Sequence, residues 1–237
     1  MDLDVHGLAQ GYLKSLKARG GAIVTDAGVY ALGRRDGLWE VETAAGRFSA
    51  PLVVNAAGAW ADEVAAIAGM PALGLVPKRR TAFTFDPPLG MAVAEWPLVC
   101  DVDDAFYFKP DAGRILASPA DATPSPPCDA QPEELDLAVG VARIEEATTM
   151  AVPRIAHKWA GLRTFAPDGS PVVGFDEAAR DFFWLAGQGG YGIKTAPALA
   201  RAAASLIFGG NLPDDLAALG IERQDLAPAR LGRLKAS

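Results

Sequence analysis

Phe182-Phe-Trp-Leu-Ala-Gly-Gln-Gly-Gly-Tyr-Gly192 is the stretch of sequence that decides the fold. Its apolar start predicts a buried strand, and the alanine-rich run from Ile193 to Phe208 predicts a helix directly after the glycines. The glycines match G-x-G-x-x-G, but a Rossmann unit needs a second parallel strand after the helix, and here a polar tail follows. The segment therefore indicates either a helix N-terminus that faces an anionic or polar group, or a tight structural turn.

A second segment of small residues, Val53-Val-Asn-Ala-Ala-Gly-Ala-Trp60, has the form of a buried strand that runs into a turn. Small side chains let a ligand or another chain segment approach the backbone closely. Taken alone, this segment fits either close helix–strand packing or binding. The helix expected after it spans 60–68.

Hydrophobic periodicity and turn residues predict the other elements, which lie before and after these two segments. Before residue 75 they are a helix with an apolar stripe from Val5 to Leu16, capped by Asp4, and strands at 22–25, 29–34, 38–43, 47–49 and 51–54. After it they are strands at 75–85, 98–101, 105–109, 114–118, 152–165 and 171–174, a surface loop at 120–130, a helix from 132 to about 146, and a polar tail after about residue 212. This order predicts an α+β or α/β fold and excludes an all-β sandwich.

Composition excludes several classes of protein. The 237 residues carry a net charge of −7, so no nucleic-acid partner is expected. No apolar run approaches the ~20 residues of a membrane span, and the acidic start does not resemble a signal peptide. Two cysteines cannot form a disulfide framework, which favours a cytoplasmic location.

Three polar side chains in apolar surroundings are candidates for binding. Lys78-Arg79-Arg80 lies within an expected strand, where Arg79 and Arg80 point to opposite faces; one can face solvent while the other enters a pocket, or both can form a solvated edge. Arg163 lies in Trp159-Ala-Gly-Leu-Arg-Thr-Phe165, and a buried guanidinium there needs either a structural Asp or a ligand carboxylate. Tyr107, between two phenylalanines, is a core aromatic with a hydroxyl available to a ligand.

Other polar residues give no comparable signal. His6 and His157 have no neighbouring ligand pattern, and Cys100 and Cys128 have no nucleophile signature. No metal site and no catalytic acid, base or nucleophile is therefore predicted.

Together and in this order, the segments resemble the carboxyl-terminal part of a flavin-dependent amine oxidoreductase of the D-amino acid oxidase superfamily. The motifs that carry the resemblance are V-V-N-A-A-G-A-W-A-D, W-A-G-L-R-T-F-x-P-D-G-x-P-V-x-G and G-Q-G-G-Y-G-I. L-x-P-K-R-R-T-A-F-x-F, F-Y-F-K-P-D-A-G and I-E-E-A-T-T resemble the D-arginine dehydrogenases within that superfamily. The similarity runs from about Leu3 to Leu226.

The resemblance implies FAD as cofactor and a fold with an inserted, mostly antiparallel substrate-binding domain at 77–164. Residues 1–76 and 165–237 would form a partial FAD-binding domain. Substrate would be bound by Arg80, Tyr107, Arg163 and the backbone of Gly190. The implied cofactor-binding residues are Val29, Ala57, Gly58, Trp60, Gly187, Gly189, Gly190, Tyr191, Gly192 and Ile193.

The chain departs from the family in one respect. The family opens with a Rossmann βαβ unit that holds the ADP half of FAD, and this sequence contains no such segment. We therefore expect a fragment, a truncated gene product, or one half of a split enzyme whose partner chain supplies the Rossmann segment. The strand at Val53–Asn55 is then expected to lack sheet neighbours, and FAD binding by the chain alone is expected to be weak.

The implied activity is oxidation of a D-amino acid, a basic one such as D-arginine, to an imino acid by hydride transfer from Cα to flavin N5. Two alternatives stay open from the sequence. One is a glycine or sarcosine type of amine oxidase. The other is a non-catalytic subunit of a heteromeric flavin dehydrogenase.

Overall fold

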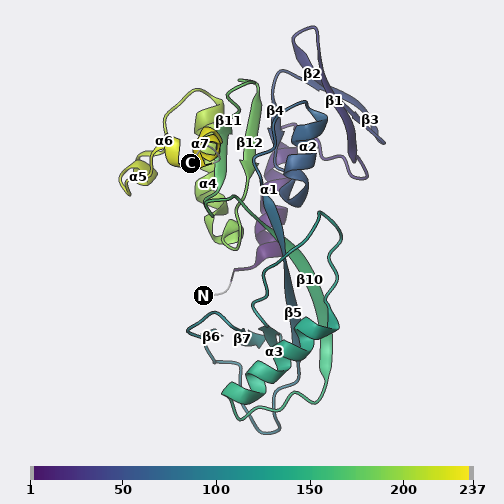
Figure 1. Cartoon of the computed structure of the whole chain (residues 1–237), viewed down its shortest axis with the longest axis vertical. Coiled ribbons are helices and arrows are strands. Elements are labelled where there is room, and N and C mark those ends of the chain that lie inside the picture. Colours follow the sequence, from purple (N-terminus) through teal and green to yellow (C-terminus); the bar gives the residue numbers. More distant parts are fainter. Residues whose placement is uncertain (1–2, 235–237) are drawn as a thin grey trace. The chain divides into compact units, whose positions relative to one another are not determined.

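A computed structural model describes residues 3–234 of the chain and divides it into two compact units (Figure 1). The first unit comprises 1–74 and 166–237, of which residues 1–2 and 235–237 lie outside the described part. The second unit comprises 75–165. The domain boundaries predicted after residues 76 and 164 lie within two residues of these divisions, and the binding role of each unit stays a prediction.

The first unit contains two small sheets. Strands β1 (Val29–Arg35), β2 (Leu38–Thr43) and β3 (Gly46–Ala50) form an antiparallel meander. Strands β11 (Val172–Phe175), β12 (Phe182–Ala186) and β4 (Val53–Asn55) form the other sheet, in the order β11-β12-β4. The helices of this unit are α1 (Val5–Ala18), the 3₁₀ helix η1 (Gly58–Trp60), α2 (Ala61–Ile67), α4 (Gly192–Ile207), α5 (Asp214–Ala217), α6 (Arg223–Leu226) and α7 (Ala229–Leu234).

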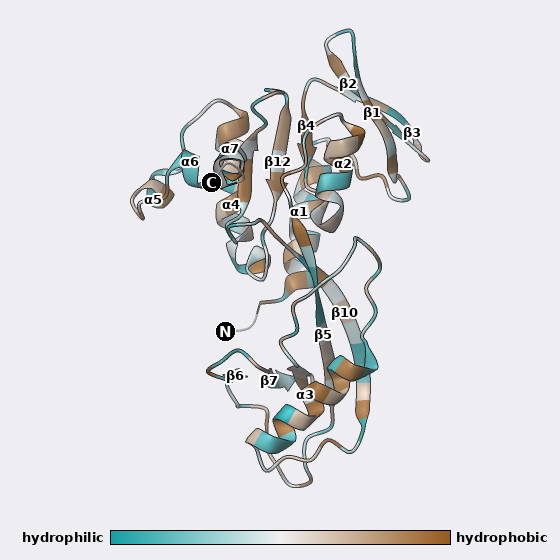
Figure 2. Cartoon of the chain, in the orientation of Figure 1, coloured by the Kyte–Doolittle hydropathy of each residue, from teal (hydrophilic) through white to brown (hydrophobic). Residues whose placement is uncertain are grey.

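The parallel pairing of β4 with β12 corrects the expectation that Val53–Asn55 lacks sheet neighbours. Strand β12 is hydrophobic along its length (Figure 2) because both faces of this strand are covered. Phe183 packs against Ala202 and Leu206 of α4. Within the described chain, β4 has a neighbour on one side only, so its other edge is open.

Helix α1 begins as the sequence predicts and then differs from an ordinary amphipathic helix. The Asp4 carboxylate accepts a hydrogen bond from the Gly7 N–H at 2.8 Å, which caps the helix. No residue of α1 is buried, so its apolar stripe has no partner in the described chain. The strand predicted at 22–25 does not form, because no described strand pairs with that segment.

The carboxyl-terminal segment, for which the sequence predicted only a polar tail, is ordered into the short helices α5, α6 and α7. Leu226 and Leu231 are buried, and Leu226 packs in the same cluster as Phe183. Arg230 donates to Asp168 through Nε at 2.7 Å and Nη2 at 3.2 Å, which attaches α7 to the turn before β11.

The second unit is a six-stranded, antiparallel sheet covered on one face by a helix. Its strands are β5 (Val76–Phe85), β6 (Val99–Cys100), β7 (Tyr107–Asp111), β8 (Arg114–Ser118), β9 (Thr123–Pro124) and β10 (Ile155–Phe165), and its helix is α3 (Glu134–Ala147). The order is β10-β5-β8-β7-β6, and β9 pairs with β5. The fold is therefore mixed α/β with antiparallel sheets, as predicted in that respect.

The covered face of this sheet contains the core of the second unit. Phe83 and Phe85 of β5 pack with Leu137 and Ile144 of α3. The helix lies so close that a Cβ on Gly140 would come within 2.9 Å of Phe83 Cε1. The opposite face of β5 is consequently available for other roles.

Among residues 3–234, no helix is long and apolar enough to cross a membrane.

Candidate functional site

Arg79 and Arg80 are neighbours in β5 with opposite surroundings. Arg79 faces α3 and forms ion pairs with Glu133 and, at 2.9 Å, with Asp136. Its side chain is 12% exposed. Burial alone would lower the pKa of Arg79, but the hydrogen bonds to both acids raise the pKa overall. The prediction of opposite faces is confirmed, and the solvated basic edge is wrong because Arg79 is enclosed and paired.

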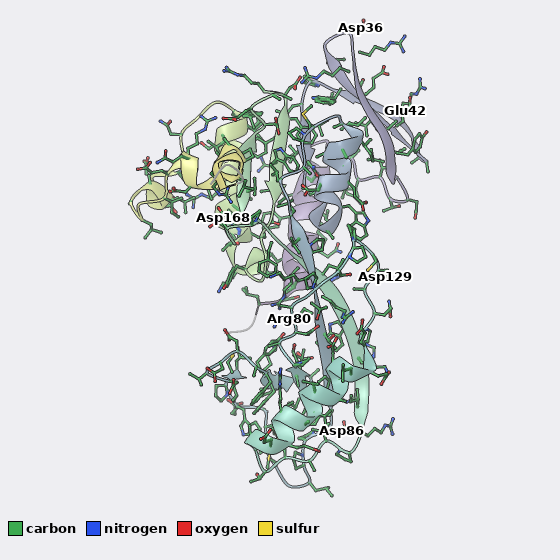
Figure 3. All side chains as sticks on the ribbon, viewed as in Figure 1. Asp36, Glu42, Arg80, Asp86, Asp129 and Asp168 are labelled. Carbon is green, nitrogen blue, oxygen red and sulfur yellow. The ribbon has the colours of Figure 1, made fainter. Side chains whose placement is uncertain are left out.

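Arg80 (labelled in Figure 3) lies on the other face of the sheet, where Arg163 joins it. Gly161 of β10 stands opposite Arg80, and Arg163 stands opposite Lys78. Residues opposite each other in an antiparallel pair share a face, so Arg80 and Arg163 are diagonal neighbours. Tyr107 of β7 lies within hydrogen-bonding range of Arg80. The structure thus brings together all three side chains that the resemblance assigns to the substrate carboxylate.

The electrostatic environment of Arg80 is unfavourable to its own charge. Burial and the nearby charge of Arg163 hold the pKa of the Arg80 guanidinium below its ordinary value, while Tyr107 and Asp121 act in the opposite direction. The Arg80 Nε atom is buried and has no hydrogen-bond partner. The Nε atom of Arg79 is also buried without a partner, so this feature does not separate the two arginines; the absence of an ion-paired acid at Arg80 does.

Arg163 has no acidic partner within the described chain, where no ion pair joins it to an Asp or a Glu. The interpretation that Arg163 pairs with a structural Asp is therefore wrong for the described residues. Space lies next to both arginines, because a Cβ placed on Gly161 would meet no other atom within 4 Å. Two guanidinium groups beside open space can bind an anion by paired, charge-assisted hydrogen bonds.

Asp121 is a charged residue at the edge of β5, next to this site, whose position the sequence analysis missed. It lies in the segment taken as a surface loop, between β8 and β9, and accepts a hydrogen bond from the Thr81 N–H at 2.7 Å. The only signal in the sequence was an acid three residues after Ser118, at the end of a predicted strand. Periodicity could not show that this loop returns to the edge of β5.

The glycine loop of the first unit lies between β12 and α4. Gly187 and Gly189 have φ values of +69° and +54°, which other residues adopt only with strain. A Cβ on Gly187 would also come within 3.4 Å of Ala166, so the first glycine is required by the fold itself. The turn interpretation is therefore correct for Gly187.

The start of helix α4 has uncapped N–H groups at Gly192 and Ile193, whereas the Tyr191 N–H donates to the Gln188 carbonyl at 3.1 Å. No side chain caps this end, and Gly190, Tyr191 and Ile193 are exposed, the last two by 52% and 46%. Free N–H donors, glycines and exposed apolar side chains together suit the polar edge of a flat, partly apolar ring system. The loop that precedes Gly192, the first residue of α4, is therefore suited to contact a flavin.

The other predicted cofactor residues occupy two places in the first unit. Ala57 and Gly58 follow β4, where Asn55 shapes the turn by donating to the Ala61 carbonyl at 2.8 Å and accepting from the Ala57 N–H at 3.3 Å. Trp60 ends η1 and is 44% exposed. Val29 opens β1 in the separate meander. The structure thus does not bring these residues together in one sheet.

Comparison with known proteins identifies the class to which this fold and these sites belong. The family described as FAD dependent oxidoreductase (DAO) matches residues 1–206. The chain belongs to this family, and the prediction of FAD as its cofactor is confirmed at that level.

Individual relatives agree with the family. Mitochondrial dimethylglycine dehydrogenase of Rattus norvegicus is 29% identical over 209 residues, which are 80% of this chain and 24% of that protein. The crystal structure of glycine oxidase from Geobacillus kaustophilus aligns with a TM-score of 0.70 and 25% identity over 91% of this chain and 57% of that one. L-proline dehydrogenase from P. horikoshii shares the fold, with a TM-score of 0.74 and 24% identity over 94% of this chain and 59% of that one. The chain thus spans well under two thirds of the length of each protein.

Proposed function

We propose that the chain provides the carboxylate-binding site and the flavin-facing loop of an enzyme that oxidises amino acids. The observation that supports this is the pair of guanidinium groups, Arg80 and Arg163, on one open sheet face with no ion-paired acid. A structural arginine would resemble Arg79, which has two acidic partners. An unneutralised pair is suited to an anionic ligand.

Each residue has a proposed role in orienting the substrate. Arg80 and Arg163 would hold the carboxylate by paired hydrogen bonds, and the Tyr107 hydroxyl would restrict where Arg80 points. When the carboxylate is fixed, the Cα–H bond of the substrate is held in one orientation. The reaction then no longer depends on random encounters in solution. When bound, FAD supplies the redox chemistry, with N5 accepting the hydride from Cα.

The loop before α4 would hold the cofactor. The N–H groups at Gly190 and Gly192 would stabilise the negative charge that the ring carries after reduction, whereas the Tyr191 N–H already donates to the Gln188 carbonyl at 3.1 Å. Gly187 and Gly189 would keep this backbone in its left-handed form, and Ile193 would pack against the ring. Val29, Ala57, Gly58 and Trp60 stay proposed contacts for the rest of FAD.

The identity of the amino acid has two candidates. The motifs around Arg80, Tyr107 and Ile144 favour a basic D-amino acid such as D-arginine. The names of the relatives, glycine oxidase and dimethylglycine dehydrogenase, favour glycine or an N-methylated glycine. All of these substrates carry the carboxylate that the site would bind.

The exposed, free thiols of Cys100 and Cys128 support a cytoplasmic location.

Matched pairs of substrates test the proposal in the flavin-loaded enzyme without oxygen. D-arginine is compared with agmatine, and glycine with methylamine, because each pair differs by the carboxylate alone. We expect the amino acid of one pair to bleach the oxidised flavin and its amine to react more slowly by on the order of a hundredfold. Equal rates within each pair would refute the carboxylate role. Bound flavin that no amino acid reduces would instead support a non-catalytic subunit.

A partner for the first unit is proposed from its open surfaces. Tyr12 and Leu16 of α1 are 50% and 44% exposed, and Val54 of the edge strand β4 is 40% exposed. We propose that a separate chain with a βαβ unit covers them and supplies the Rossmann segment of the flavin-binding domain. The chain alone should then bind FAD weakly and tend to aggregate. Purification of this chain alone with stoichiometric flavin would contradict the proposal.

A further inference from the structure

Arg143 of α3 forms hydrogen bonds to the ends of two neighbouring strands. Its Nη1 atom donates to the Ala105 carbonyl at 2.5 Å and to the Pro119 carbonyl at 2.9 Å. Ala105 lies two residues before the first residue of β7, and Pro119 directly follows the last residue of β8. Within residues 3–234, no acid forms an ion pair with Arg143, so its charge is directed at backbone oxygens and not at a carboxylate.

The two carbonyls lie where the pairing of β7 with β8 stops. The last residues to pair are Tyr107 and Ser118. Pro119 has no N–H and cannot continue the ladder of hydrogen bonds. A Cβ on Gly140, one turn before Arg143, would come within 3.3 Å of Pro119, so the helix passes close to this point. Arg143 thus supplies the donor that the ladder lacks and joins the start of β7 to the end of β8.

Tyr107 connects this end of the sheet to Arg80. The phenylalanines on either side of Tyr107 pack in the core with α3, so Tyr107 points to the opposite face, on which Arg80 lies. Ser118, its partner in β8, donates through its hydroxyl to the Thr81 carbonyl at 2.6 Å, and Thr81 follows Arg80 in β5. The Tyr107 hydroxyl lies within hydrogen-bonding range of the Arg80 guanidinium. The position of the start of β7 therefore decides how Tyr107 meets Arg80.

We propose that Arg143 is a positioning residue of the carboxylate site, on which it acts from the far side of the sheet through Tyr107. This inference rests on the proposed carboxylate site. By holding the segment that leads into β7, Arg143 keeps the Tyr107 hydroxyl next to Arg80. A guanidinium that is already held in one orientation loses less freedom when a carboxylate binds, so the affinity of the site for a carboxylate is higher.

Acetate is the probe, and its binding to the full chain is measured at constant ionic strength by tryptophan fluorescence, since Trp159 stands opposite Ala82 on the face of Arg80. Arg143→Ala should weaken acetate binding on the order of threefold. Arg143→Lys should retain most of the affinity, because both bonds come from one nitrogen and an ammonium has three donors. Arg143→Gln, which lacks the charge, should also weaken binding and replaces the alanine variant if that one does not fold.

Combination with Tyr107→Phe separates the positioning role from a general structural one. Tyr107→Phe alone should weaken acetate binding, because the hydroxyl that restrains Arg80 is lost. In that background Arg143→Ala should cause no further loss, since the two residues act through the same contact. A general loosening of the sheet would instead weaken binding to the same extent with or without the Tyr107 hydroxyl.

Arg114→Ala is the matched control, because it removes an arginine contact, to Asp86 at 3.1 Å, from the opposite end of the same pair of strands. It should leave the acetate affinity unchanged. Arg163→Ala shows whether acetate binds at this site at all. Binding that depends on Arg163 but is unchanged in Arg143→Ala, or that falls equally with and without the Tyr107 hydroxyl, overturns the role of Arg143 alone. Acetate that does not bind, or that binds equally well without Arg163, overturns the carboxylate site and the positioning role together.

Discussion

The two faces of the sheet in the second unit use the same residue type for different purposes. On the face under α3, Arg79 is enclosed and neutralised by Glu133 and Asp136. On the other face, Arg80 and Arg163 lie near each other without an ion-paired acid. The difference teaches that charge alone does not mark a functional arginine. The presence or absence of an ion-paired acid separates the structural arginine of one face from the proposed carboxylate-binding pair of the other.

Alanine substitution of the adjacent arginines tests this contrast most strongly. Arg79→Ala leaves Asp136 without its partner and should lower the free energy of unfolding by about 1–3 kcal/mol. Arg80→Ala removes a charge that burial and Arg163 disfavour, so stability should change by less than about 0.5 kcal/mol. Urea denaturation of both variants measures the difference. Equal destabilisation would mean that Arg80 is also structural.

Arg230 provides a second structural arginine, in the first unit, with which to sharpen the comparison. Its hydrogen bonds to Asp168 lower the pKa of that carboxyl below the ordinary value of 3.8. Burial of the carboxyl acts in the opposite direction but does not cancel this effect. The stabilisation is present above pH 3.8 and is lost as the pH falls through the lowered value. Arg230→Ala should cost about 1–2 kcal/mol at neutral pH. Its unfolding midpoint should approach that of the unaltered chain in acid, and a constant gap across pH would contradict the pairing.

Gly161 gives the smallest expected effect on stability. The space beside it is open, so Gly161→Leu should change the free energy of unfolding by less than about 1 kcal/mol. The new side chain would fill the position in front of Arg80 and should abolish the binding of acetate. Gly169→Leu is a contrasting control, because its φ of +76° makes substitution costly although no atom crowds it. Acetate binding that survives Gly161→Leu would place the anion elsewhere.

The sequence predicted most elements of the sheet and the helices, because apolar periodicity and turn residues are local signals. It also predicted the opposite faces of Arg79 and Arg80, since strand geometry alternates strictly. The resemblance selected Arg80, Tyr107 and Arg163, which the structure brings together.

Features that depend on distant contacts could not be predicted. Asp121 returns to β5 through an irregular connection, and only its bonds to Thr81 show its place at the edge of that strand. The helices after residue 212 depend on contacts such as that between Arg230 and Asp168, which are 62 residues apart. The segment at 22–25 has the composition of a strand, but a strand forms only where a neighbour accepts its hydrogen bonds.

The turnover of Arg163→Ala in the flavin-loaded enzyme tests the central claim most directly. With the amino-acid substrate, kcat/KM should fall on the order of 10²–10³-fold, because the carboxylate loses a charge-assisted partner. Arg163→Lys should restore part of the rate, since an ammonium offers the charge without the paired donors. Flavin content and the rate with an amine that lacks a carboxylate should stay unchanged. Loss of flavin or unfolding in Arg163→Ala would contradict the account and identify Arg163 as a structural residue.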